Sequence, residues 1–287
     1  MRLFASALVA SILAGIGSQA HAQTLKVDYD LSLAGLPLGT AALSSTFAKK
    51  KYQVEGSVRL SGLVRLLTGV RGEAMARGVL SEERPKPASF AVISISSSDQ
   101  RRVKMGLRSG NVAEVEIDPP LEPKPDRVPV KAVDKKRVVD PVSALLMPVT
   151  VSGDPTHPDN CNRSIPVFDG ASRFDVVLSY AETRAAEVPG YSGPVLVCNA
   201  RYVPISGHRA QRPGTKFMME NKDMSVWLAP VEGQRVLFPL RVSVRTMIGT
   251  SVAEASSWSV EDGAQVIRAN GRRPVRAKDA VRAGASQ

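Results

Sequence analysis

The sequence reads Cys161-Asn-Arg-Ser-Ile-Pro-Val-Phe-Asp-Gly-Ala-Ser-Arg-Phe-Asp-Val-Val-Leu-Ser-Tyr180, and then Gly190-Tyr-Ser-Gly-Pro-Val-Leu-Val-Cys-Asn-Ala-Arg-Tyr202. These pieces hold the only two cysteines of the chain, and each cysteine stands beside a run typical of a β-strand. Asp169-Gly170 separates the runs 164–168 and 173–180, and glycine in such a pair admits the positive φ of a hairpin turn. The stretch therefore predicts neighbouring antiparallel strands with a cysteine close to each.

Alternation of apolar and polar residues continues on both sides of this stretch. Between residues 24 and 33, Leu25, Val27 and Tyr29 alternate with Lys26 and Asp28, which is the period of a half-buried strand. Further strand patterns occupy residues 40–47, 52–60, 71–80, 88–96, 101–108, 111–117, 195–202, 218–228, 235–247 and 251–260. Because a closed or nearly closed sheet hides its edges, we predict a mainly β protein with a strongly curved antiparallel sheet or incomplete barrel.

Two short helices interrupt the strands. Residues 61–67 break the alternation with the spacing of one or two helical turns, closed by Gly69. Residues 140–147 form the clearer helix: Asp140 can cap it, Pro141 suits its first turn and Pro148 ends it. Residues 118–130 have no apolar period and are expected to be an exposed loop.

The first residues have the pattern of an export signal. Arg2 gives a positive start, a short apolar run extends to Ile16, and Ala20-His21-Ala22 resembles a cleavage site. A membrane-spanning helix needs about 20 apolar residues, and Gly15 shortens this run. We therefore expect a signal peptide over residues 1–22, a periplasmic mature protein, and a single β-rich domain over residues 23–267.

Export would affect the oxidation state of the two cysteines. In an oxidising compartment, Cys161 and Cys198 are expected to form a disulfide. A zinc site with His157 and His208 is the alternative, but structural zinc sites bring their ligands in close pairs, and these spacings differ. The sequence predicts no metal site and no cofactor.

The net charge of +11 is concentrated near the end of the chain. Residues 268–287 contain six basic residues and one acidic residue, which is typical of a solvated tail. For an exported protein nucleic acid is not an expected partner, whereas peripheral contact of this tail with an anionic membrane is.

Candidate catalytic groups are few. The expected mature chain contains only His157 and His208, both in loop-like sequence, and no G-x-S-x-G motif is present. Asp169 and Asp175 could be imagined as paired carboxylates of a glycosidase. However, Asp169 suits the turn, and Arg173 with Asp175 suits a surface ion pair. We therefore expect no enzyme, and keep an uncharacterised hydrolase as an alternative.

Several short pieces, in order along most of the mature chain, resemble a family of exported bacterial proteins known as domain of unknown function 3108. The most specific are Asp140-Pro-Val-Ser-Ala-Leu145 and Phe168-Asp-Gly-Ala-Ser-Arg-Phe-Asp175. Others include Gly35-Leu-Pro-Leu-Gly39 and Pro239-Leu-Arg-Val242. The resemblance implies an envelope location and a curved antiparallel sheet similar to that of periplasmic lipoprotein carriers, and it implies no catalytic residues.

The leading functional expectation is a non-enzymatic envelope protein that binds an apolar or amphiphilic partner, such as lipid or an acylated protein. Six residues on the two expected helices are candidates for lining an apolar cavity: Leu63, Leu66, Leu67, Leu145, Leu146 and Met147. The alternative for these side chains is that they fill the core. A structural protein that acts through its outer surface and basic tail is the other alternative.

Overall fold

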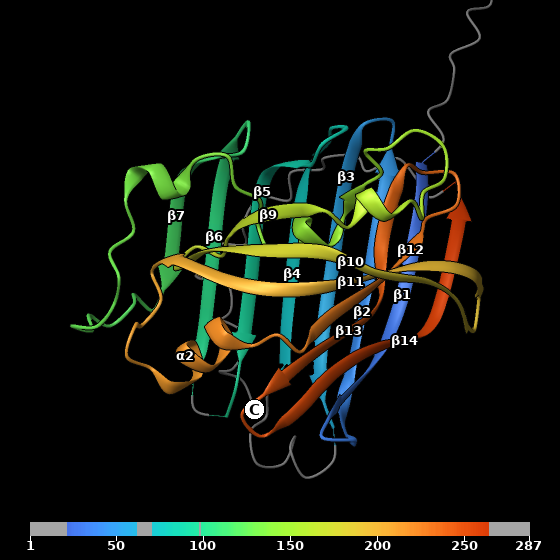
Figure 1. The fold of residues 1–287 in the computed structure, drawn as a ribbon. Coiled ribbons are helices and arrows are strands. Elements are labelled where there is room, and N and C mark those ends of the chain that lie inside the picture. Colours follow the sequence, from blue (N-terminus) through green and yellow to red (C-terminus); the bar gives the residue numbers. More distant parts are fainter. Residues whose placement is uncertain (1–21, 62–70, 98, 264–287) are drawn as a thin grey trace, which may run out of the picture.

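The computed structural model describes residues 22–61, 71–97 and 99–263 (Figure 1). The expected signal peptide, except Ala22, the expected helix with Leu63, Leu66 and Leu67, and the basic tail lie outside the described residues. None of the described helices is long and apolar enough to cross a membrane.

One antiparallel sheet of 14 strands dominates the described chain, which confirms the predicted fold class. Its strands are β1 (Ala22–Leu33), β2 (Leu36–Ala48), β3 (Lys51–Leu60), β4 (Arg71–Leu80), β5 (Pro85–Ile95), β6 (Gln100–Arg108), β7 (Asn111–Asp118), β8 (Met147–Pro148), β9 (Arg163–Phe168), β10 (Arg173–Val188), β11 (Tyr191–Ser206), β12 (Met224–Pro230), β13 (Val236–Thr246) and β14 (Gly249–Asp262). The helical elements are the 3₁₀ turns η1 (Ala132–Lys135), η2 (Ser143–Leu145) and η3 (Pro158–Asn160), and the helix α2 (Pro213–Glu220).

The strand order is β7-β6-β5-β4-β3-β2-β1-β14-β13-β12-β11-β10-β9, with β8 paired to β13. Strands β1 to β7 form a meander away from β1, and β9 to β14 form a second meander that returns to it. Pairing of β1 with β14 joins the two meanders into one sheet. Residues 119–162 carry the chain from the edge strand β7 to the other edge strand, β9.

The sheet folds over itself, so that β9–β11 cross in front of β3–β6 at a steep angle (Figure 1). A first hydrophobic cluster fills the space between the two halves, with Val27, Val54 and Phe90 from one half and Val195 and Phe238 from the other. Tyr29 on β1 also donates a hydrogen bond to the carbonyl of Pro239 on β13, at 2.6 Å. The alternating pattern of β1 therefore has its predicted result: Leu25 and Val27 are buried, whereas Lys26 and Asp28 face outward.

A second hydrophobic cluster lies on the other face of β11–β13. Along β11, Val195 and Val197 belong to the first cluster, whereas Leu196 and Cys198 belong to the second. Because neighbouring residues of a strand point to opposite faces, this half of the sheet is apolar on both sides. The segment containing Met147, Val149 and Cys161 supplies the apolar side chains that pack in this second cluster.

One predicted helix and one predicted strand need correction. The expected helix 140–147 is only the 3₁₀ turn η2, after which Met147–Pro148 pairs as a short strand with β13. Proline disfavours a helical conformation in the residue before it, so Pro148 sends Met147 into the sheet. The expected strand 218–228 begins only at Met224, because residues 218–220 belong to α2.

Candidate functional site

A groove of about 710 Å³ crosses the face of β1–β6 that points away from the first hydrophobic cluster. Two adjacent rows of cross-strand neighbours line it over seven strands, from β14 through β1 to β6. The first row is Ser257, Asp28, Ala42, Ser57, Glu73, Ile93 and Arg102, and the second row is Ser259, Lys26, Ser44, Glu55, Met75, Ala91 and Lys104.

Small side chains explain why the sheet is hollowed here. Ala42, Ser44, Ser57 and Ala91 stand where outward-facing strand positions usually carry long polar side chains. Met75 and Ile93, with the exposed edges of inward-facing residues such as Val92, make much of the remaining wall apolar. With strands spaced at about 4.8 Å, seven strands give this trough a length of roughly 29 Å.

The charged residues of the groove are distributed along its length. Arg102 and Lys104 lie at the β6 end, where Lys104 pairs with Glu116 at 3.3 Å. At the opposite end, Lys26 pairs with Glu261 at 2.8 Å and Asp28 accepts a hydrogen bond from Ser257 at 2.7 Å. Between these ends, Glu55 and Glu73 stand among the small and apolar residues of the trough, and Glu55 accepts a hydrogen bond from Gln53 at 2.6 Å.

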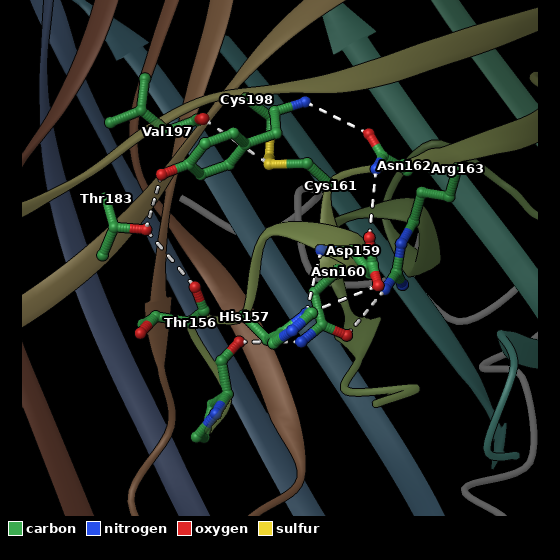
Figure 2. The surroundings of a disulfide bond; sticks show 12 residues. Thr156, His157, Asp159, Asn160, Cys161, Asn162, Arg163, Thr183, Val197 and Cys198 are labelled. Carbon is green, nitrogen blue, oxygen red and sulfur yellow. Dashed lines mark hydrogen bonds and ion pairs between the residues drawn. A yellow bond between two sulfur atoms is a disulfide. The ribbon is translucent and has the colours of Figure 1, made fainter. Parts of the chain in front are cut away.

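The two cysteines form a disulfide, which confirms the predicted bond (Figure 2). Both sulfurs are buried in the second hydrophobic cluster. The bond ties the turn after η3 to the middle of β11, and Asn160 fixes the preceding loop by accepting hydrogen bonds from the amide and hydroxyl of Thr150 at 3.0 and 3.2 Å. Because the sulfurs bind each other, they are not ligands of the zinc site that was the alternative.

Both histidines lie in loops, as expected. His157 is the N-terminal cap of η3, where its Nδ1 accepts the amide hydrogen of Asp159 at 3.3 Å. His208 follows β11, and its carbonyl accepts a hydrogen bond from the amide of Val128 at 2.9 Å. Neither imidazole accepts a hydrogen bond from a hydroxyl group in the described part of the chain. No group of three metal-ligating side chains occurs among these residues either.

The two candidate carboxylates have separate partners. Asp169 accepts hydrogen bonds from the amides of Ala171 and Ser172 at 2.8 and 2.6 Å, so it shapes the β9–β10 turn as expected. Asp175 pairs with Arg173 at 2.7 Å. The side chains of this pair are only 25% and 13% exposed, so the ion pair is formed but lies deeper than the predicted surface position.

A buried polar network surrounds Asp140. Its Oδ1 accepts hydrogen bonds from the amides of Val142 and Ser143, and its Oδ2 accepts one from the Ser143 hydroxyl at 2.6 Å. The Ser143 hydroxyl also bonds the hydroxyl of Tyr52 on β3, at 2.7 Å. Burial raises the pKa of Asp140 to about 6, against the opposing effect of these hydrogen bonds. The network thus joins the crossover segment to the first half of the sheet.

The described residues proposed to line an apolar cavity lie in or against the two clusters. Leu146 is buried in the first cluster, Leu145 packs against it, and Met147 is buried in the second. Leu146 and Met147 also border a pocket of about 310 Å³ beside the β4–β5 turn.

The outer groove itself was missed by sequence reasoning. A run of small outward-facing residues at Ala42, Ser44 and Ser57 was its only local signal, and the pairing of β1 with β14 was needed to place Ser257 beside it.

Comparison with known proteins gives a family but no activity. No curated protein matches the sequence. Among solved structures, the chain resembles the "Crystal Structure of Beta-barrel-like Protein of Domain of Unknown Function DUF1849 from Brucella abortus", with 11% identity and a TM-score of 0.47. That match covers 83% of this chain and 98% of the other. The family described as "Protein of unknown function (DUF3108)" matches residues 28–256, as the sequence resemblance had predicted. The chain therefore belongs to the DUF3108 family.

Proposed function

We propose that this protein is a non-enzymatic component of the bacterial periplasm that binds an apolar or amphiphilic partner, a lipid or the acyl chain of a protein, in the outer groove. The observation that carries the proposal is the groove of about 710 Å³, whose small and apolar residues, with Glu55 and Glu73 among them, lie between Lys26 at one end and Lys104 at the other. Its volume falls within the range of small-molecule sites, roughly 300–1,000 Å³.

The dimensions of the groove suit an acyl chain. One leaflet of a bilayer core is about 15 Å thick, so one extended acyl chain is shorter than the trough of roughly 29 Å. Each methylene removed from water contributes about 0.8 kcal/mol. Arg102 and Lys104 at the β6 end supply positive charge for an anionic head group.

The periplasmic part of the proposal is supported by the signal-like start of the sequence and by the disulfide. N-terminal sequencing of protein from a periplasmic extract should give a chain that begins near Gln23. Protein found only in the cytoplasm, with residues 1–22 attached, would refute this location.

The binding part is tested by filling the groove. Protein purified from envelope extracts would be analysed by native mass spectrometry and by solvent extraction of bound lipid. The wild-type protein should carry acyl-containing mass, and Ala42→Trp should lose it because an indole would occupy the floor. Thr40→Trp is the matched control, since Thr40 faces the same side of β2 but does not line the groove. Equal lipid content in all three proteins, or none in the wild type, would refute the proposal.

A further inference from the structure

A pocket of about 340 Å³, distinct from the outer groove and from the pocket beside the β4–β5 turn, lies between the loop after β7 and the β9–β10 turn. It shares no lining residue with the outer groove. Leu121, Val128, Val130 and Phe168 supply apolar walls. The only charged side chains that line it are cations, Lys124, Arg127 and Lys135. Apolar walls combined with positive charge alone favour a ligand that has an anionic head and an apolar tail.

Arg127 is positioned by the protein to receive such a head group. Its Nη1 donates a hydrogen bond to the carbonyl of Gly207 at 2.7 Å, which fixes the guanidinium. Its Nε is buried and has no hydrogen-bond partner among the described residues. Nη2 has no hydrogen bond to the described chain either, so neither nitrogen of the Nε–Nη2 edge has a partner among these residues. That edge presents two parallel N–H groups, the geometry that binds carboxylate and phosphate oxygens in pairs.

The acidic residues near the pocket have other partners. Glu122 pairs with Lys124 at 2.8 Å, and Asp126 binds Nε of Arg209 at 2.9 Å. Asp134 accepts the amide hydrogen of Lys131 at 2.8 Å. Lys135 forms no ion pair with the described residues. Of the three cations that line the pocket, Arg127 and Lys135 therefore form no ion pair with the described residues.

We infer that this pocket binds a small amphiphile with a single oxyanion head, held by Arg127 and Lys135, and with an alkyl tail against Leu121, Val128 and Phe168. The inference concerns a different site from the outer groove and stands without it. A carboxylate and a phosphate monoester share the required head chemistry, and the experiment below separates them.

The test is isothermal titration calorimetry of the purified protein with decanoate, decyl phosphate, decanol and inorganic phosphate, each below its micelle-forming concentration. At least one of decanoate and decyl phosphate should bind ten or more times as tightly as decanol and as inorganic phosphate. The tighter of the two identifies the head group. If decanol binds as tightly as the preferred amphiphile, the cations do not contribute to binding. If inorganic phosphate binds as tightly, the apolar walls do not contribute. Either result would overturn the inference.

Variants assign the binding to this pocket. Arg127→Lys keeps the charge but removes the two-pronged edge, and should weaken binding of the preferred amphiphile about tenfold. Lys135→Gln should weaken binding of the preferred amphiphile several-fold, because it removes one of the two proposed head-group cations. The Lys135 side chain has no hydrogen bond or ion pair with the described residues, so this variant tests the pocket even if the Arg127 variant does not fold. Lys131→Gln is the matched control, because Lys131 lies in the same loop but does not line the pocket. Unchanged affinity in both test variants refutes the inference.

Ala42→Trp separates the two sites. It should leave binding of the preferred amphiphile unchanged, because Ala42 lines only the outer groove. If binding is lost in Ala42→Trp and kept in Lys135→Gln, the amphiphile occupies the groove. That outcome would overturn the pocket and leave the proposed function intact.

Discussion

Asp140 shows how a residue identified from sequence acquires a property that only the fold determines. The Asp-Pro-Val-Ser spacing predicted that its carboxylate accepts backbone N–H bonds, and the amides of Val142 and Ser143 do donate to it, although the N-cap of the short turn η2 is Val142. Its complete burial was not predictable, because the residues around it come from β3 and from the crossover segment, which are far apart in the sequence. Local patterns reveal hydrogen bonds between neighbours, whereas burial depends on distant contacts.

The raised pKa of Asp140 predicts a pH-dependent stability. The folded value of about 6 lies above the ordinary value of 3.8, so this group stabilises the fold fully below pH 4 and loses that contribution as pH rises through 6. The loss amounts to about 3 kcal/mol. Urea unfolding from pH 4 to 7.5 should therefore show Asp140→Asn becoming more stable relative to wild type as pH rises. A difference between the two proteins that stays constant across this range would contradict the assignment.

Gly190, at the tip of the β10–β11 hairpin, tests the packing of this hairpin against β14. It has a φ of 88°, and a Cβ there would collide with the backbone carbonyl of Trp258 on β14. Gly153 has the same φ but nothing within 4 Å of the corresponding position, so it is a matched control. Gly153→Ala should cost about 1 kcal/mol of strain, and Gly190→Ala clearly more, in chemical unfolding. Equal losses would mean that the hairpin tip does not contact β14.

At the scale of elements, strands were predicted well and helical segments poorly. Alternation over ten residues, as in β1, is a strong signal because one face of the strand is buried along its whole length. Near α2, the predicted strand 218–228 wrongly included residues 218–220, which belong to the helix. The side chain of Asn221 accepts a hydrogen bond from the amide of Asp223 and donates one to the carbonyl of Arg245. These hydrogen bonds fix the short connection between α2 and β12. Because Asn221 and Arg245 are 24 residues apart, the local sequence does not predict this hydrogen bond.

The disulfide tests the account of the second hydrophobic cluster. Its loop spans 37 residues, and a bond closing a loop of this size contributes roughly 3–4 kcal/mol. The double variant Cys161→Ala, Cys198→Ala should lose about that much in chemical unfolding, because the covering segment becomes less constrained. A reducing agent should destabilise the wild type and leave the double variant unaffected. If reduction does not change unfolding of the wild type, the bond is absent or does not constrain this segment.

At the scale of the whole molecule, the class of fold was predictable but the outer groove was not. The curved, unclosed sheet follows from many alternating strands that must hide their apolar faces. The groove depends on the register between strands, which places Lys26, Ser57 and Lys104 on one surface. Pairing of β1 with β14 then adds Ser257 from the other end of the chain. This register depends on contacts between distant segments, so it cannot be predicted from local patterns in the sequence.

The proposed binding of an acyl chain in the outer groove is tested most directly by a crystal structure of the protein purified from envelope extracts. We predict continuous elongated density over Ala42, Ser57 and Ala91, crossing the strands between Lys26 and Lys104. Density for the ligand between the two halves of the sheet, among Val27, Phe90 and Phe238, with only solvent in the groove, would contradict the account.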